Sequence, residues 1–333
     1  MMPEELDYQK NIDILLKNKL INFEEIYDFH ELPRADVFQR AFNFFQGNIF
    51  KHYNYGISPG LFYFNPETSV NARAGKINNY YLISINKGTI FRLLKTYNDN
   101  ALILEIPELN FLKKLEKKTS NPINELMFQI CCNFTFYHEL AHLIQKTETQ
   151  KFNMSEDISN FESFNVNNHI LEYDADLFSA ICIGTHLYQY INKYCPKANN
   201  KESEKIISII GAGIFNYLLI FKSTKAPFYL RENSHPHPIV RIICIIYFIT
   251  DYIEFVSNKR SDIILNKEGI ISNIILYAKY IADYFIPDET MKHINKIFVE
   301  DKEKAVIYSQ ELFSLVKDFR FSAYNKRNAI LMK

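Results

Sequence analysis

Two histidines and a glutamate form the pattern with the clearest chemistry in this chain: His138, Glu139 and His142, in the stretch His-Glu-Leu-Ala-His. The surrounding residues 127–145 are mostly apolar and follow the periodicity of a helix. On a helix, residues four apart lie one above the other, so both imidazoles can reach one metal ion. Glu139 is the next residue around the helix. Its carboxylate can therefore act as a general base toward a water molecule at the metal without binding the metal itself.

A catalytic zinc ion usually has three protein ligands and one open position, so a third ligand is expected further along the chain. Glu172 is the candidate, in the first turns of the next expected helix. Asp176 lies four residues later on the same face, where it can accept a hydrogen bond from a ligating histidine and fix its tautomer. The alternative is an acidic helix N-terminus that complements the helix dipole. The histidine pair upstream favours metal binding.

A third segment, Ser234-His235-Pro236-His237-Pro238, enters an apolar helix that holds Arg241 in its first turn. Arg241 in an apolar stripe needs an anionic partner or a polar cavity, because burying an unpaired charge is very costly. A histidine in this segment could donate a hydrogen bond to the oxyanion formed when water attacks a carbonyl group. The spacing to Arg241 favours His235 for this role, with His237 as the alternative. A rigid turn with no chemistry is the other interpretation.

In this order, the three segments resemble the gluzincin metallopeptidases, in which H-E-x-x-H is followed by E-x-x-A-D and later by H-P-x-x-x-x-R. The matching residues are His138–His142, Glu172–Asp176, His235-Pro236 and Arg241. CaaX prenyl proteases and HtpX-type peptidases carry the same trio. So do soluble phage-exclusion peptidases of the Lit type, which are the nearer match because the chain shows no clear membrane span.

The resemblance implies a zinc-dependent metalloendopeptidase that hydrolyses a cytosolic protein or peptide. It assigns the Zn²⁺ ligands to His138, His142 and Glu172. Glu139, His235 and Arg241 are then the catalytic residues, with Asp176 behind a ligand histidine. Phage defence and protein quality control are both compatible with this chemistry. The alternatives are a catalytically silent zinc-binding regulator on a peptidase scaffold and a metal-free helical protein.

Composition is that of a well-cored globular protein: 47% of the 333 residues are hydrophobic and 23% are charged. The formal net charge is zero and no run of Lys and Arg is present, so nucleic acid is not an expected partner. The acidic start lacks the pattern of a signal peptide, and five cysteines without a C-x-x-C pair indicate a reducing compartment. The cytoplasm is therefore the expected location. The apolar runs Ile206–Phe221 and Ile239–Val256 are expected to be buried core helices.

The expected fold is α+β and predominantly α, with a zincin-like metallopeptidase core and a small edge-strand sheet over the H-E-x-x-H helix. Its parts are an N-terminal α+β region (1–110), a helical core (111–256) and a C-terminal helical region (257–333), expected to form one compact unit. Leu61–Phe64 and Tyr80–Ile85 have the composition of short strands. The segment Asn71–Ala74, leading into Tyr80–Ile85, resembles the edge-strand region of those enzymes, where a strand pairs with an extended substrate. Residues up to about 55 are expected to be helical. A helix is expected from Pro122 to about residue 146, and the next one begins near residue 168. Two further helices are expected over about 203–222 and 237–256.

Overall fold

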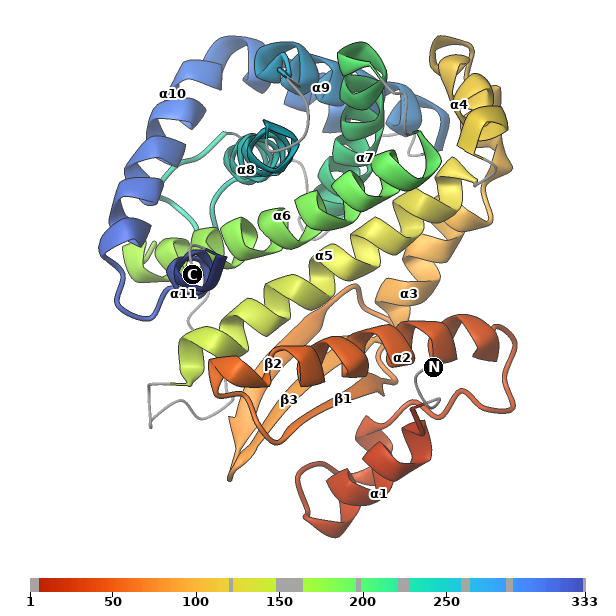
Figure 1. Cartoon of the computed structure of the whole chain (residues 1–333), viewed down its shortest axis with the longest axis vertical. Helices are drawn as coiled ribbons and strands as arrows, with labels where there is room; N and C mark the ends of the chain where they lie inside the picture. The colour runs from red at the N-terminus through yellow and green to blue at the C-terminus, as the bar shows by residue number, and fades with distance from the viewer. Residues whose placement is uncertain are drawn as a thin grey trace. The chain divides into compact units, whose positions relative to one another are not determined.

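A computed structural model describes residues 6–119, 122–147, 164–195, 199–220, 228–258, 264–285 and 290–331. These residues are mostly helical and include one small mixed sheet, so the predicted class, α+β and predominantly α, is confirmed (Figure 1). The chain divides into two compact units. Unit 1 comprises Met1–Arg92, Thr135–Ile158 and Arg320–Lys333, and unit 2 comprises Leu93–Phe134 and Ser159–Phe319. The three regions expected from the sequence stay a prediction.

Unit 1 holds the sheet and the part of helix α5 that carries the two histidines. Its elements are α1 (Tyr8–Lys17), α2 (Ala35–Lys51), β1 (Gly60–Asn65), β2 (Ala72–Ile77), β3 (Tyr80–Asn86), most of α3 (Lys87–Leu93), α5 (Ile123–Lys146) from Thr135 onward, and α11 (Ala323–Leu331). Short 3-10 turns at Phe23–Glu25 and Tyr53–Tyr55 join them. The strands and the helix expected in this part of the chain are confirmed.

The sheet has the strand order β1-β3-β2, with β1 parallel and β2 antiparallel to β3. Strands β2 and β3 form a hairpin across the two-residue turn Asn78-Asn79, in which Asn78 has φ 54°. Strand β3 is paired on both sides, so it is the central strand and does not lie at an edge of the sheet. Among the described strands, β2 takes that edge position beside β3.

Helix α2 runs along the sheet (Figure 1). It packs there through aromatic side chains and one buried amide. The Phe45 ring lies 5.0 Å from Phe62 on β1 and stacks on Phe136 of α5 at 4.8 Å, centroid to centroid. Gln46 accepts a hydrogen bond from the Phe62 N–H (2.8 Å) and donates one to the Gly60 carbonyl (3.0 Å). These contacts fix the sheet to the helix that carries His138 and His142.

Unit 2 consists of helices in the part of the chain that the structure describes. They are α4 (Phe111–Thr119), α5 up to Phe134, α6 (Val166–Tyr194), α7 (Asn200–Ile220), α8 (Pro238–Asn258), α9 (Lys267–Phe285) and α10 (Thr290–Asp318). A π-helical turn at Leu94–Asn98 and 3-10 turns at Ala101–Glu105 and Pro107–Leu109 precede them. Helix α6 packs mainly on α8 and α10, and α7 packs on α9.

The two apolar runs are buried helices, α7 and α8, as expected, apart from Phe221, which lies outside the described residues. Among the described helices, α7 is the one long and apolar enough to cross a membrane, and 83% of its apolar window is buried. Gly213 on α7 accepts a hydrogen bond from the Tyr97 hydroxyl through its carbonyl (2.8 Å). This pattern fits a core helix.

Gly88 provides a stability test of the sheet, because a Cβ atom there would lie 2.0 Å from the Thr68 carbonyl oxygen. We expect Gly88→Ala to lower the free energy of unfolding by about 2 kcal/mol or more, since backbone must move. Gly47→Ala is the matched control: its Cβ would meet no heavy atom closer than 3.9 Å, and alanine favours the α2 helix by up to about 1 kcal/mol. Melting temperatures from circular dichroism check both. Equal melting temperatures would contradict the close approach.

Candidate metal centre

His138 and His142 lie on one face of α5, as the four-residue spacing requires, and each is 9% exposed. Their ring planes are nearly perpendicular at 88°, and the two Nε2 atoms face each other at 3.2 Å. Two nitrogen lone pairs at this distance repel each other unless a proton or a cation lies between them. Either one ring therefore carries its proton on Nε2 and donates to the other, or a cation lies between the two nitrogens.

The separation of the two Nε2 atoms also fits zinc. Histidine nitrogens bind zinc at about 2.0–2.1 Å, and the tetrahedral angle then places two such nitrogens about 3.3 Å apart. The observed 3.2 Å agrees with this value. The histidine pair thus already has the spacing of two zinc ligands.

His142 has a buried hydrogen-bonding partner that the sequence analysis missed. The Oε1 atom of Gln145, a residue 3% exposed, lies 2.8 Å from the His142 Nδ1 atom. Gln145 is three residues after His142, so both side chains share one face of α5. The three-residue spacing is a signal that the sequence already contains, although the residue expected behind a ligand histidine was Asp176. That role of Asp176 stays a prediction.

Within unit 2, Asp176 and Arg241 form a buried ion pair that joins α6 to α8. Arg241 donates from Nε to Oδ2 and from Nη2 to Oδ1 of Asp176, both at 2.7 Å. The Asp176 side chain is 0% exposed and that of Arg241 is 13% exposed. The expected pairing of Arg241 with an acid is confirmed, and it is bidentate, the strongest geometry for this pair.

Glu172 belongs to the same charged group, one turn before Asp176 on α6. Its Oε2 atom lies 3.9 Å from the Arg241 Nη2 atom. Burial by itself would lower the pKa of Arg241, but the Asp176 carboxylate outweighs burial and Glu172 acts in the same direction. The pKa of Arg241 is therefore held above its ordinary value, and the guanidinium stays charged.

The structure distinguishes the two histidines of the His-Pro segment. The His235 Nε2 atom lies 3.6 Å from Glu172 Oε1, and its Nδ1 atom lies 2.8 Å from the Ser234 hydroxyl. His237 is 3% exposed, packs edge-on against Phe228 and Tyr229, and accepts a hydrogen bond from the Ile239 N–H. His235 is thus the one beside Glu172, and His237 packs in the core at the start of α8.

A buried histidine on α6 anchors the segment that carries His235. His169 is 0% exposed; its Nε2 atom lies 2.7 Å from the Asn233 carbonyl and its Nδ1 atom lies 2.8 Å from the Tyr308 hydroxyl. Because the carbonyl can only accept, Nε2 carries the proton and Nδ1 accepts from Tyr308. His169 therefore ties α6, the His-Pro segment and α10 together.

Among the described residues, one set of three metal-ligating side chains could hold a metal ion: His138 and His142 of unit 1 with Glu172 of unit 2. Glu172 is 9% exposed, like the two histidines. This buried triad could bind a metal ion, and its donor set of two imidazoles and one carboxylate is one that catalytic zinc sites use.

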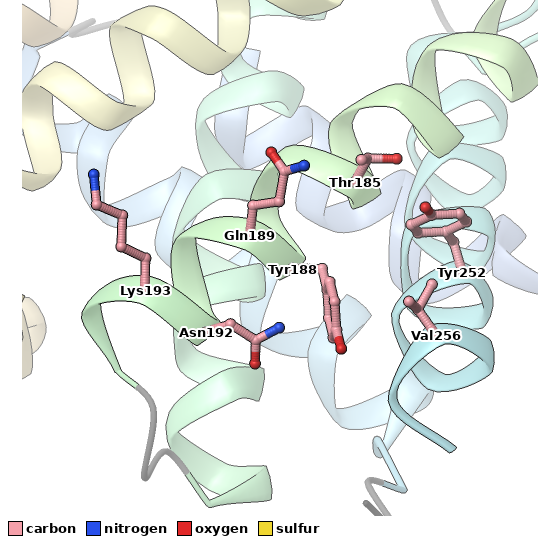
Figure 2. Close-up of a pocket in the computed structure, with 7 residues that line it drawn as sticks. All are labelled: Thr185, Tyr188, Gln189, Asn192, Lys193, Tyr252 and Val256. Atoms are coloured by element: carbon pink, nitrogen blue, oxygen red, sulfur yellow. The ribbon is translucent and has the colours of Figure 1, made fainter. Parts of the chain in front are cut away.

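A surface hollow on unit 2 does not coincide with this group. Figure 2 shows its lining side chains, which come from the later turns of α6 and from α8: Thr185, Tyr188, Gln189, Asn192, Lys193, Tyr252 and Val256. Thr185 is 13 residues after Glu172, or about 20 Å along α6 at 1.5 Å per residue. Lys193 is the one charged side chain in the lining, so the hollow offers no acid–base pair.

Comparisons with known proteins identify no relative: no protein family, no curated protein and no solved structure matches the chain.

The buried ion pair gives a test of the geometry on α6. We expect Asp176→Asn to lower the free energy of unfolding by about 3–5 kcal/mol, because Arg241 stays buried without a compensating charge. Asp36→Asn is the matched control, since Asp36 and Arg40 form an i,i+4 pair with both side chains 66% exposed. Its expected effect is below about 0.5 kcal/mol. Denaturant titrations measure both, and similar small losses would show that the Asp176 pair is not buried.

Proposed function

We propose that this chain is a zinc-dependent endopeptidase with a zincin-like core of the gluzincin type. The observation that supports the proposal most strongly is the convergence of His138 and His142 Nε2 atoms at 3.2 Å on an H-E-x-x-H helix. Glu172 on α6 is the proposed third donor. Two imidazoles, one carboxylate and an adjacent glutamate base are together the requirements of this chemistry.

Zinc bound by His138, His142 and Glu172 would supply Lewis acidity, lowering the pKa of a water molecule toward neutrality and polarising the scissile carbonyl. Glu139 accepts a proton from the attacking water as the water oxygen bonds to the carbonyl carbon. Glu139 then delivers this proton to the amine nitrogen as the C–N bond breaks. One water is consumed and the products are a carboxylate and an amine, with no change in oxidation state.

His235 is the proposed donor to the oxyanion that develops on the carbonyl oxygen. When the Ser234 hydroxyl donates to His235 Nδ1 across 2.8 Å, the ring proton is on Nε2, the nitrogen that faces Glu172. An N–H held in this way can stabilise negative charge without reorganisation. Arg241 lies 2.7 Å from Asp176 and 3.9 Å from Glu172 and joins α8 to α6, so it supports the site through these carboxylates.

An extended peptide is the substrate proposed for the edge of the sheet in unit 1. Asn71 accepts a hydrogen bond from the Asn86 N–H. By the antiparallel alternation, Arg73, Gly75 and Ile77 then bond to β3, and the backbone groups of Ala72, Ala74 and Lys76 point to the other edge of β2. The Ala74 carbonyl accepts a hydrogen bond from the Lys146 ammonium, four residues after His142 on α5 (2.8 Å). Strand addition at this edge would place a peptide backbone beside the C-terminal end of the histidine-bearing helix.

A cytosolic protein is the proposed target, and phage defence and protein quality control are the two proposed settings. A catalytically silent zinc-binding regulator is the second candidate, because the metal-ligand geometry supports binding whether or not a peptide is cleaved. Metal content and cleavage therefore have to be measured separately.

Metal content is the first test. We expect the chain, purified without added metal, to contain about one zinc per molecule, and His142→Ala to lose it because a zinc site with two protein ligands is weak. His30→Ala is the control, since His30 is exposed and paired with Asp28. Elemental analysis measures all three proteins. Zinc retained by His142→Ala, or absent from the wild type, would contradict the proposed centre.

Cleavage is the second test, with Glu139→Gln as the variant. We expect it to retain zinc and to lose several orders of magnitude in turnover, because the amide cannot accept the proton of the attacking water. Protein N-termini of cells expressing wild type and variant are compared, and sites found with wild type alone identify the target and the cleavage specificity.

Glu125→Gln is the matched control for that comparison, because Glu125 lies in the first turn of the same helix and bonds to Gln129 (3.0 Å). It should cleave as wild type does. Wild-type turnover in zinc-loaded Glu139→Gln would refute the assignment of the base. If the wild type and both variants bind zinc but none cleaves a protein, the catalytically silent zinc-binding regulator is favoured.

A further inference from the structure

We propose that Gln145 is a positioning residue that fixes the tautomer of His142 and thereby makes Nε2 the metal-binding nitrogen. The inference deepens the proposed function: its consequence for metal binding rests on that proposal, whereas the tautomer itself does not. Gln145 lies on the same helix as His142, in the same unit, and touches the ring nitrogen that faces away from His138.

The direction of the Gln145 hydrogen bond decides the tautomer. An amide oxygen can only accept, so Oε1 at 2.8 Å from His142 Nδ1 requires the proton on Nδ1. The His142 Nε2 atom then carries a lone pair, and this lone pair faces the His138 Nε2 atom at 3.2 Å. If the amide were reversed, its NH₂ group would donate to Nδ1 and the proton would be on Nε2. The two orientations therefore predict opposite tautomers.

Burial makes this bond effective. Gln145 is 3% exposed and His142 is 9% exposed, so water competes weakly for the ring nitrogen and the ring is held in one orientation. The amide is a neutral acceptor, and it raises the basicity of Nε2 less than a carboxylate would. Gln145 thus orients His142 without adding a negative charge beside the histidine pair.

The tautomer is measurable in the wild-type protein without any substitution. The full chain is labelled with nitrogen-15 on histidine and freed of metal with a chelator, and long-range proton–nitrogen correlation spectra are recorded. We expect His142 in the form with the proton on Nδ1. A proton on Nε2 would overturn the proposal, since Gln145 would then be the donor.

Metal affinity tests the consequence with two variants and a control. Gln145→Met keeps a similar volume but removes the acceptor, and we expect zinc affinity to fall by about 10–100-fold in competition with a chromophoric chelator. Gln145→Glu restores an acceptor and should bind zinc at least as tightly as wild type. Gln129→Met is the control, because Gln129 is an exposed residue of α5 whose amide bonds to Glu125.

Unchanged zinc affinity and an unchanged His142 spectrum in folded Gln145→Met would overturn the role of Gln145. If this variant does not fold, the wild-type spectrum alone decides. Zinc bound with no peptide cleaved would refute the endopeptidase and leave the Gln145 proposal standing. A chain that binds no zinc but shows the Nδ1–H tautomer would retain the tautomer assignment and refute its metal-binding consequence.

Discussion

The geometry of unit 2 around Glu172 depends on one interaction, the buried bidentate pair between Asp176 and Arg241. It joins α6 to α8 at a buried point, where either charge without its partner would strongly destabilise the fold. Because Glu172 lies one helical turn before Asp176, and His235 lies six residues before Arg241, the pair determines where both are held. In this arrangement the His235 Nε2 atom lies 3.6 Å from Glu172 Oε1, and His169 holds the same segment through the Asn233 carbonyl.

On α5, by contrast, the constraint is the helix itself. The four-residue repeat places His138 above His142, and apolar neighbours exclude water from the pair. The stack of Phe45 on Phe136 fixes this helix against α2 and the sheet. The helical repeat by itself is therefore enough to bring the two Nε2 atoms together.

The residues that the sequence predicted well are those whose roles follow from helical spacing or from charge. His138 and His142 lie side by side as their spacing requires, and buried Arg241 is paired with the acid Asp176. Gln145 was not predicted, because a glutamine near a helix end is usually exposed. No neighbouring residue in the sequence indicates that its side chain is buried. Choosing between His235 and His237 needed the rings of Phe228 and Tyr229, which the sequence does not place. The central position of β3 depended in the same way on its non-local pairing with β1.

The energetics of α6 give a physical reason to regard this region as a site and not as ordinary core. Glu172, Asp174 and Asp176 are 9%, 0% and 0% exposed, on a helix that also buries Tyr173, Ala175 and Leu177. Removing carboxylates from water costs several kcal/mol each, and replacing buried ion pairs by apolar side chains is often neutral or stabilising. Stability alone would therefore favour leucine or methionine here. The buried carboxylates of α6 are therefore better explained by a role other than stability.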